Sequence, residues 1–166
     1  MLLSAALSAE TAILDCTADG WVERGRLTGT SPLVELDYAG KTVLMAFRAS
    51  LIAGWKVTKA TLILRVASET TPQRLRVGVV GRVWKETDET ASVPSAGTEL
   101  AVPAPEQGWL RFEVDPRVVQ AIADGKSHGL LLSRATPAGD YRFHAREGVQ
   151  FAPILVVDGQ APPVRF

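Results

Sequence analysis

Hydrophobic and polar residues alternate along most of the chain. In the segment 109–114, Leu110, Phe112 and Val114 take every second position. Alternation with a period of two is typical of β-strands that bury one face. Similar patterns predict further strands at 43–48, 57–66, 74–83, 141–144 and 154–157. The continuous apolar run 130–132 predicts a strand that is covered on both faces.

One segment departs from this alternation. Asp115 is a good helix N-cap, Pro116 suits the first helical position, and Gly125 is a typical helix stop. The apolar residues between them recur at helical spacing, at Val118, Val119 and Ile122. We therefore expect a short helix at about 115–124, and a long loop at 85–107. Together the elements predict an all-β, antiparallel sandwich or barrel with one short helix.

A chain of 166 residues suits one domain. We expect a single β-sandwich domain at 15–159 and a C-terminal tail at 160–166. The segment 1–14 is expected to be an apolar arm or the remnant of a leader. As an arm, it would use Leu2, Leu3 and Leu7 to assemble with a neighbouring subunit, by adding to the edge of that subunit's sheet.

The charged and reactive residues favour binding over catalysis. The chain has 18 basic and 18 acidic residues, and no basic stripe that would suit nucleic acid. Cys16 is the only cysteine, which excludes an internal disulfide. The two histidines, His128 and His144, stand outside any nucleophile or zinc motif. We therefore expect no enzyme, no nucleic-acid partner and no transmembrane segment.

Several longer segments resemble one known family. They are Ala18-Asp-Gly-Trp-Val22, residues 43–48 with 51–64, Trp84-Lys-Glu-Thr87, Phe112-Glu-Val-Asp115, residues 141–147 and residues 153–157. Over roughly Asp19 to Gly159, the chain resembles DNRLRE-type domains related to carbohydrate-binding module family 96. The resemblance implies a jelly-roll β-sandwich, extracellular use and a role in binding glycans.

Aromatic rings stack on sugar rings while polar neighbours bind the hydroxyl groups, so the tryptophans are candidate glycan-binding residues. Trp84 ends a strand at the start of the long loop, with Arg82 and Glu86 beside it. Trp55 follows a turn and is expected to be the most exposed tryptophan. The candidate glycan site is therefore Trp84, Glu86, Arg82 and Trp55, and the alternative is that three of the four tryptophans belong to the core.

Loop carboxylates suggest a structural calcium ion as the one cofactor to consider, because Ca²⁺ binds six to eight oxygens. Asp15, Asp19 and Asp140 are the expected ligands, and Glu23 and Glu147 are further candidates. These carboxylates do not have the spacing of an EF-hand loop.

Two functional hypotheses follow. The first is a non-catalytic module for recognition and adhesion that binds glycans and is displayed on an extracellular, cell or virion surface. The second is a purely structural subunit that assembles with copies of itself or with other particle subunits, such as a phage decoration or tail protein or an extracellular filament. The bias toward Arg, 13 of the 18 basic residues, suits an acidic glycan and a subunit interface equally.

Overall fold

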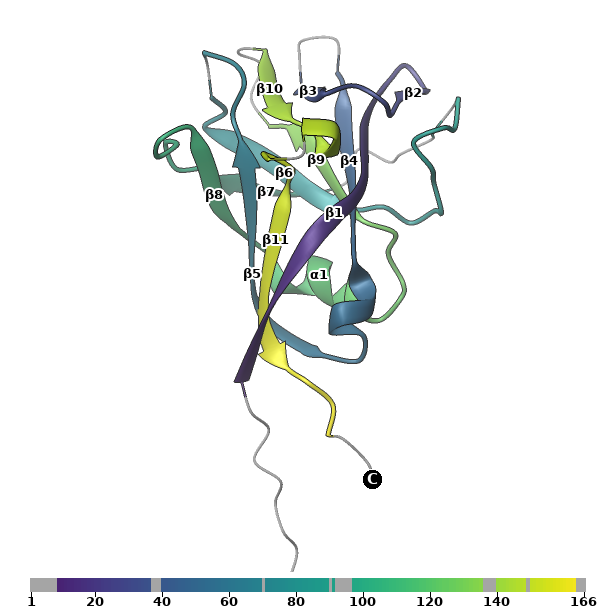
Figure 1. The fold of residues 1–166 in the computed structure, drawn as a ribbon, viewed down its shortest axis with the longest axis vertical. Helices are drawn as coiled ribbons and strands as arrows, with labels where there is room; N and C mark the ends of the chain where they lie inside the picture. The colour runs from purple at the N-terminus through teal and green to yellow at the C-terminus, as the bar shows by residue number, and fades with distance from the viewer. Residues whose placement is uncertain are drawn as a thin grey trace, which may run out of the picture.

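A computed structural model describes residues 9–36, 40–69, 71–89, 91, 97–135, 140–148 and 150–163. The described residues are mostly β-strand (Figure 1). The strands are β1 (Ala9–Glu23), β2 (Arg26–Thr28), β3 (Leu33–Leu36), β4 (Thr42–Phe47), β5 (Lys56–Arg65), β6 (Arg74–Val79), β7 (Thr98–Ala101), β8 (Trp109–Val114), β9 (Leu130–Arg134), β10 (Tyr141–His144) and β11 (Ile154–Gln160). The helices are η1 (Ala49–Ile52), α1 (Pro116–Ala123) and η2 (Arg146–Gly148).

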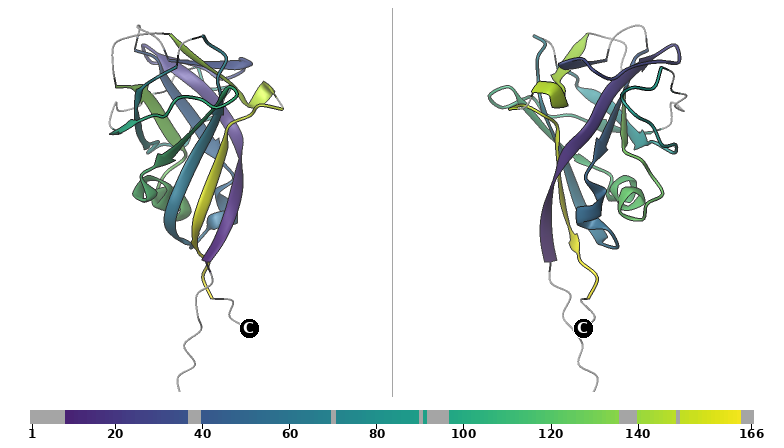
Figure 2. Two further views of the ribbon diagram at one scale, coloured as in Figure 1. Left: turned by 90° about the vertical axis from the view of Figure 1, so that its left-hand side faces the viewer. Right: turned by 45° about the vertical axis from the view of Figure 1, so that its right-hand side comes forward.

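Most of the strands form two antiparallel layers that share β1, and β3 pairs with β10 in a separate two-stranded sheet. In the first layer, the first half of β1 pairs with β11, β11 pairs with β5, and β5 pairs with β8. In the second layer, the second half of β1 pairs with β4, β4 pairs with β9, β9 pairs with β6, and β6 pairs with β7. A bulge between Cys16 and Ala18 divides the two halves of β1, and bulges bend the strand that carries them. Figure 2 shows β1 passing from one layer to the other, and the predicted all-β antiparallel sandwich is confirmed.

The hydrophobic core lies between the layers. In β8, Leu110, Phe112 and Val114 are buried and the residues between them are more exposed, as the alternation predicts. Leu130, Leu131 and Leu132 are all fully buried. Leu130 and Leu132 belong to the main core, and Leu131 belongs to a smaller cluster with Val22, Leu44 and Val80. The apolar run of β9 is therefore covered on both faces.

The predicted helix is confirmed as α1. The Asp115 side chain accepts a hydrogen bond from the Arg117 backbone N–H at 2.9 Å, which caps the first turn. Gly125 follows the helix with a φ of +69°, a conformation that favours glycine. The buried face, Val119 and Ile122, packs against β5 and η1. No helix among the described residues is long and apolar enough to cross a membrane.

Two expected boundaries differ from the structure. The predicted loop 85–107 contains β7, which pairs with β6 and is joined to it by an ion pair between Glu99 and Arg74. This short strand was missed because its partner is distant in the sequence. Residues 9–14, assigned to the arm, form the start of β1 and pair with β11. Leu2, Leu3 and Leu7 lie outside the described residues.

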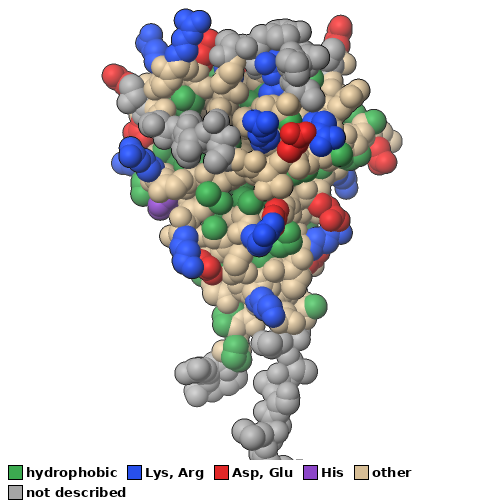
Figure 3. Space-filling model, turned by 180° about the vertical axis from the view of Figure 1, so that it is seen from behind, with side chains coloured by type: hydrophobic (Ala, Val, Ile, Leu, Met, Phe, Trp, Pro, Cys, Tyr) green, Lys and Arg blue, Asp and Glu red, His purple; other side chains and the backbone are tan. Residues whose placement is uncertain are grey.

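The face of the molecule opposite to the one in Figure 1 carries both basic and acidic side chains. Figure 3 shows basic and acidic side chains interspersed over it, with hydrophobic side chains between them. This mixture follows from the equal numbers of basic and acidic residues in the chain.

Candidate functional site

A cleft lies beside the hairpin that joins β1 to β2. Its volume is about 960 Å³, within the range of small-ligand sites. The hairpin turns through Arg24 and Gly25, which have φ values of +48° and +81°; two such residues form the tight turn that suits a β-hairpin. The cleft is lined by Glu23, Arg24, Arg26, Leu27, Thr28, Gly29, Thr30, Glu86, Thr87, Asp88 and Glu89.

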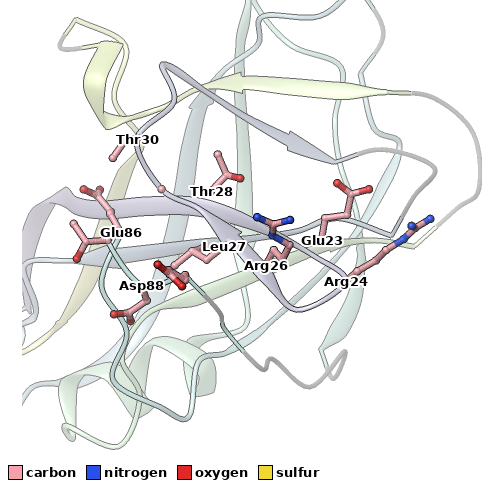
Figure 4. A pocket seen from close by; sticks show the side chains of 11 residues that line it. Glu23, Arg24, Arg26, Leu27, Thr28, Thr30, Glu86 and Asp88 are labelled. Carbon is pink, nitrogen blue, oxygen red and sulfur yellow. The ribbon is translucent and has the colours of Figure 1, made fainter.

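The second wall of the cleft is the segment 86–89, which we call the cleft loop. Backbone hydrogen bonds hold this part of the chain to the hairpin, from Leu27 N to Glu89 O at 3.2 Å and from Ala91 N to Gly25 O at 3.1 Å. The loop also packs tightly on Gly29, because a Cβ there would lie under 3.0 Å from the Glu86 backbone. Figure 4 shows Glu86 and Asp88 at one end of the cleft, Arg24 at the other, and Leu27 and Thr28 between them.

Behind the cleft loop, carboxylates from three distant segments converge on Arg146. Its guanidinium donates to Glu86 Oε1 and Oε2 at 3.1 and 2.7 Å, and to Glu147 Oε1 at 3.2 Å. Glu86 Oε1 also accepts a hydrogen bond from the Asp19 backbone N–H at 2.9 Å. In return, the Asp19 side chain accepts one from the Arg146 backbone N–H at 2.6 Å. We call Asp19, Glu86 and Glu147, with Arg146, the acidic cluster.

The surroundings of the acidic cluster shift the pKa values of Asp19 and Arg146. Burial raises the pKa of Asp19 to about 6; the neighbouring carboxylates Glu147 and Glu86 add to this rise, and the Arg146 backbone N–H opposes it. Burial also raises the pKa of the Cys16 thiol, which lies beside Asp19. The bidentate hydrogen bond to Glu86 raises the pKa of Arg146 above its usual range. An ionised Asp19 is therefore costly unless a positive charge approaches it.

The structure places the four residues of the expected glycan site in different surroundings. Glu86 lines the cleft. Trp84 is half-buried, and its indole N–H donates to the His128 carbonyl at 3.1 Å. Arg82 is exposed, and neither it nor Trp84 lines the cleft.

The expectation that Trp55 is exposed is wrong, because only 9% of its surface is accessible. Its indole packs against Gly159, because a Cβ on that glycine would lie 3.2 Å from the ring. Its carbonyl accepts a hydrogen bond from the Gln120 side chain at 2.8 Å. Gly159 has no side chain and therefore leaves room for the ring, and the sequence around Trp55 does not reveal this contact.

The expected calcium ligands also differ in burial. Asp15 and Asp140 are exposed, whereas Asp19 is 1% exposed. Among the described residues, Asp19 forms an acidic group with Glu86 and Glu147, each offering an oxygen within 4.8 Å of the others. The residue patterns had suggested Glu147 as a further partner of Asp19, but they had assigned Glu86 to the glycan site.

Sequence reasoning missed most of the hairpin wall. Arg24, Arg26 and Thr28 carry no motif, and their only signal is the glycine of a tight turn between Val22 and Leu27. It also missed Arg146, whose role depends on contacts with residues about 60 or more positions away.

A second surface feature is an aromatic group at the end of β8. The Arg65 guanidinium lies 5.5 Å from the ring centroid of Trp109 and 5.3 Å from that of Phe151. His144 lies 5.1 Å from Phe151. Because the Arg65 guanidinium lies over both Trp109 and Phe151, these rings already have a cationic partner.

Similarity to a known protein family extends over the whole site. None of the curated proteins matches the chain. The model of carbohydrate-binding module family 96 matches residues 10–159, a span that includes the cleft, the acidic cluster and nearly all of both layers. The chain therefore belongs to carbohydrate-binding module family 96.

Proposed function

We propose that the chain binds a carbohydrate in the cleft between the β1–β2 hairpin and the cleft loop, without catalysis. The observation that carries this proposal is the lining of the cleft in a chain of a carbohydrate-binding family. Thr28, Thr30 and Thr87 offer hydroxyl groups, and both basic and acidic side chains surround them.

The chemistry of the lining suits a ligand that both donates and accepts hydrogen bonds. A sugar hydroxyl does both, so guanidinium groups such as that of Arg26 can donate to it and carboxylates such as that of Asp88 can accept from it. The apolar side chain of Leu27 lies between these groups (Figure 4) and offers a contact for the C–H face of a sugar ring. The aromatic platform expected from the tryptophans is not part of this lining.

A glycan array followed by isothermal titration calorimetry tests the proposal. Arg26→Ala and Thr28→Val change exposed residues of the hairpin. Each removes hydrogen bonds to the ligand, so each is expected to weaken binding about tenfold or more.

The matched control is Arg142→Ala. This exposed arginine lines a separate cavity of about 250 Å³ with Glu35, Leu36, Asp140 and Tyr141. Its loss should leave glycan affinity unchanged. If the Arg142 variant loses binding while the hairpin variants keep it, the glycan binds in the smaller cavity and our assignment of the site is wrong.

Display on an extracellular, cell or virion surface, with a role in adhesion, is part of the same proposal. Membership of the family supports it. Immunogold labelling of native cells or particles with an antibody against the chain tests it. Gold on the outer surface is the expected result, and labelling confined to the cell interior would contradict it.

Self-assembly is the second candidate function, and one surface favours it. On the outer face of the first layer, Ile13 is 61% exposed and is paired with Val156. In the adjacent row, Ile154 is paired with Ile63, and both are partly exposed. Light scattering over a concentration series tests this candidate: an oligomer that Ile13→Thr dissociates would support it, and a monomer at every concentration would contradict it.

A further inference from the structure

Two buried carboxylate oxygens in the acidic cluster accept no hydrogen bond from the described residues. They are Asp19 Oδ1 and Glu147 Oε2, and less than 1 Å² of each atom is accessible. The Asp19 side chain as a whole is 1% exposed. A buried carboxylate oxygen without a donor is costly, so both atoms are suited to a positively charged partner.

Arg146 cannot supply this partner alone. The cluster contains three carboxylates and one guanidinium, and the guanidinium is directed to Glu86 and to Glu147 Oε1. The Arg146 backbone N–H donates a hydrogen bond to Asp19 Oδ2, so it does not reach Oδ1. The oxygens Asp19 Oδ1 and Glu147 Oε2 therefore remain available on the same cluster.

We infer that Asp19, Glu86 and Glu147 bind a divalent cation, with Ca²⁺ the best fit. The three residues each offer an oxygen within 4.8 Å of the other two. Ca²⁺ accepts six to eight oxygens in flexible geometry, whereas Mg²⁺ demands near-ideal octahedral geometry, so carboxylates supplied by three separate segments suit Ca²⁺ better. Carboxylate oxygens are the hard ligands that Ca²⁺ prefers, and waters complete its coordination.

The ligands come from three separate parts of the fold. Asp19 lies in β1, Glu86 in the cleft loop and Glu147 in η2. Glu86 also lines the cleft. The cation therefore joins the cleft loop to the two other elements and holds one wall of the cleft in place.

The test measures calcium binding directly on the full chain. The protein is stripped with EGTA, and CaCl₂ is added while thermal melting and Tb³⁺ luminescence, excited through tryptophan, are recorded. A site of ~1 mM affinity, typical of extracellular modules, raises the melting temperature by about 3–6 °C at ~10 mM calcium. MgCl₂ should give a smaller shift.

Two variants remove one ligand charge each, Asp19→Asn and Glu147→Gln. Both should lose the calcium-dependent shift and bind Tb³⁺ at least about tenfold more weakly. The matched control is Asp15→Asn, an exposed residue of the same strand that lies outside the cluster, and it should behave as the wild type. Tb³⁺ luminescence measures ion binding directly, so it remains informative for a variant with a low melting temperature.

Two results would overturn the inference. The first is a wild-type protein whose melting and Tb³⁺ luminescence do not respond to the ions, which would mean that a proton shared within the cluster takes the place of the cation. The second is unchanged affinity in both Asp19→Asn and Glu147→Gln, which would place the ion elsewhere.

Discussion

Replacing Asp19 with asparagine should stabilise the calcium-free protein at neutral pH. The pKa of Asp19 rises from 3.8 to about 6 on folding, chiefly because the side chain is buried. Because the folded-state value is the higher one, the protonated carboxyl contributes its stability fully below about pH 4, and this stability is lost as the pH rises through about 6. The rise corresponds to about 3 kcal/mol of unfolding free energy.

Asparagine keeps the size of the side chain and cannot ionise. Its carbonyl oxygen can still accept the hydrogen bond from the Arg146 backbone N–H, and its amide can donate toward Glu147 and Glu86. In calcium-free buffer at about pH 7.5, the variant should therefore be more stable than the wild type by about 2–3 kcal/mol. At about pH 4 the two proteins should differ little.

Urea denaturation followed by tryptophan fluorescence measures these differences. Asp15→Asn, which changes an exposed carboxylate of the same strand, should stay within about 0.5 kcal/mol of the wild type at both pH values. The reasoning fails if Asp19→Asn is the less stable protein at about pH 7.5. That result would mean that Arg146 already compensates the ionised carboxylate.

Three other substitutions test the fold and the cleft. Trp55→Ala should lower the free energy of unfolding by about 3–5 kcal/mol, because this indole is buried; a loss under about 1 kcal/mol in urea denaturation would contradict this. Gly29→Ala should push the cleft loop away, because its Cβ would lie under 3.0 Å from the backbone of Glu86, so calorimetry should show weaker glycan binding; unchanged affinity would show that the contact does not shape the site. Asp115→Ala should cost about 1 kcal/mol through loss of the helix cap, whereas Asp115→Asn should melt close to the wild type, and equal melting of both variants would exclude the cap as a source of stability.

Local patterns were sufficient for most strands and for α1. The alternation in β8 and the apolar run of β9 depend only on which faces are buried, and both faces can be read along the strand. The Asp115 cap and Gly125 mark the ends of α1 because capping uses residues within one turn of each other. The family resemblance supplied the sandwich as a whole.

The site was only partly predictable because its contacts are long-range. Glu86 and Asp19 were each identified as candidates, but for different ligands, since nothing local places residues 67 positions apart side by side. Glu86 meets Asp19 because the cleft loop lies against Gly29, a contact that depends on tertiary packing. The burial of Trp55 has the same origin, since its ring packs against Gly159 in β11, a strand far along the chain.

The position of β11 has a consequence for how the chain folds. β11 lies between β1 and β5 in the first layer, and the register sets Ala9 opposite Gln160. Until residues 154–160 have left the ribosome, β1 and β5 each carry an unpaired edge, which can pair with other chains. Closing such distant pairs is slow, on the order of milliseconds to seconds for all-β domains. The protein is therefore vulnerable to aggregation in the interval before β11 docks, and a co-expressed chaperone that covers the exposed strand edges should raise the soluble yield.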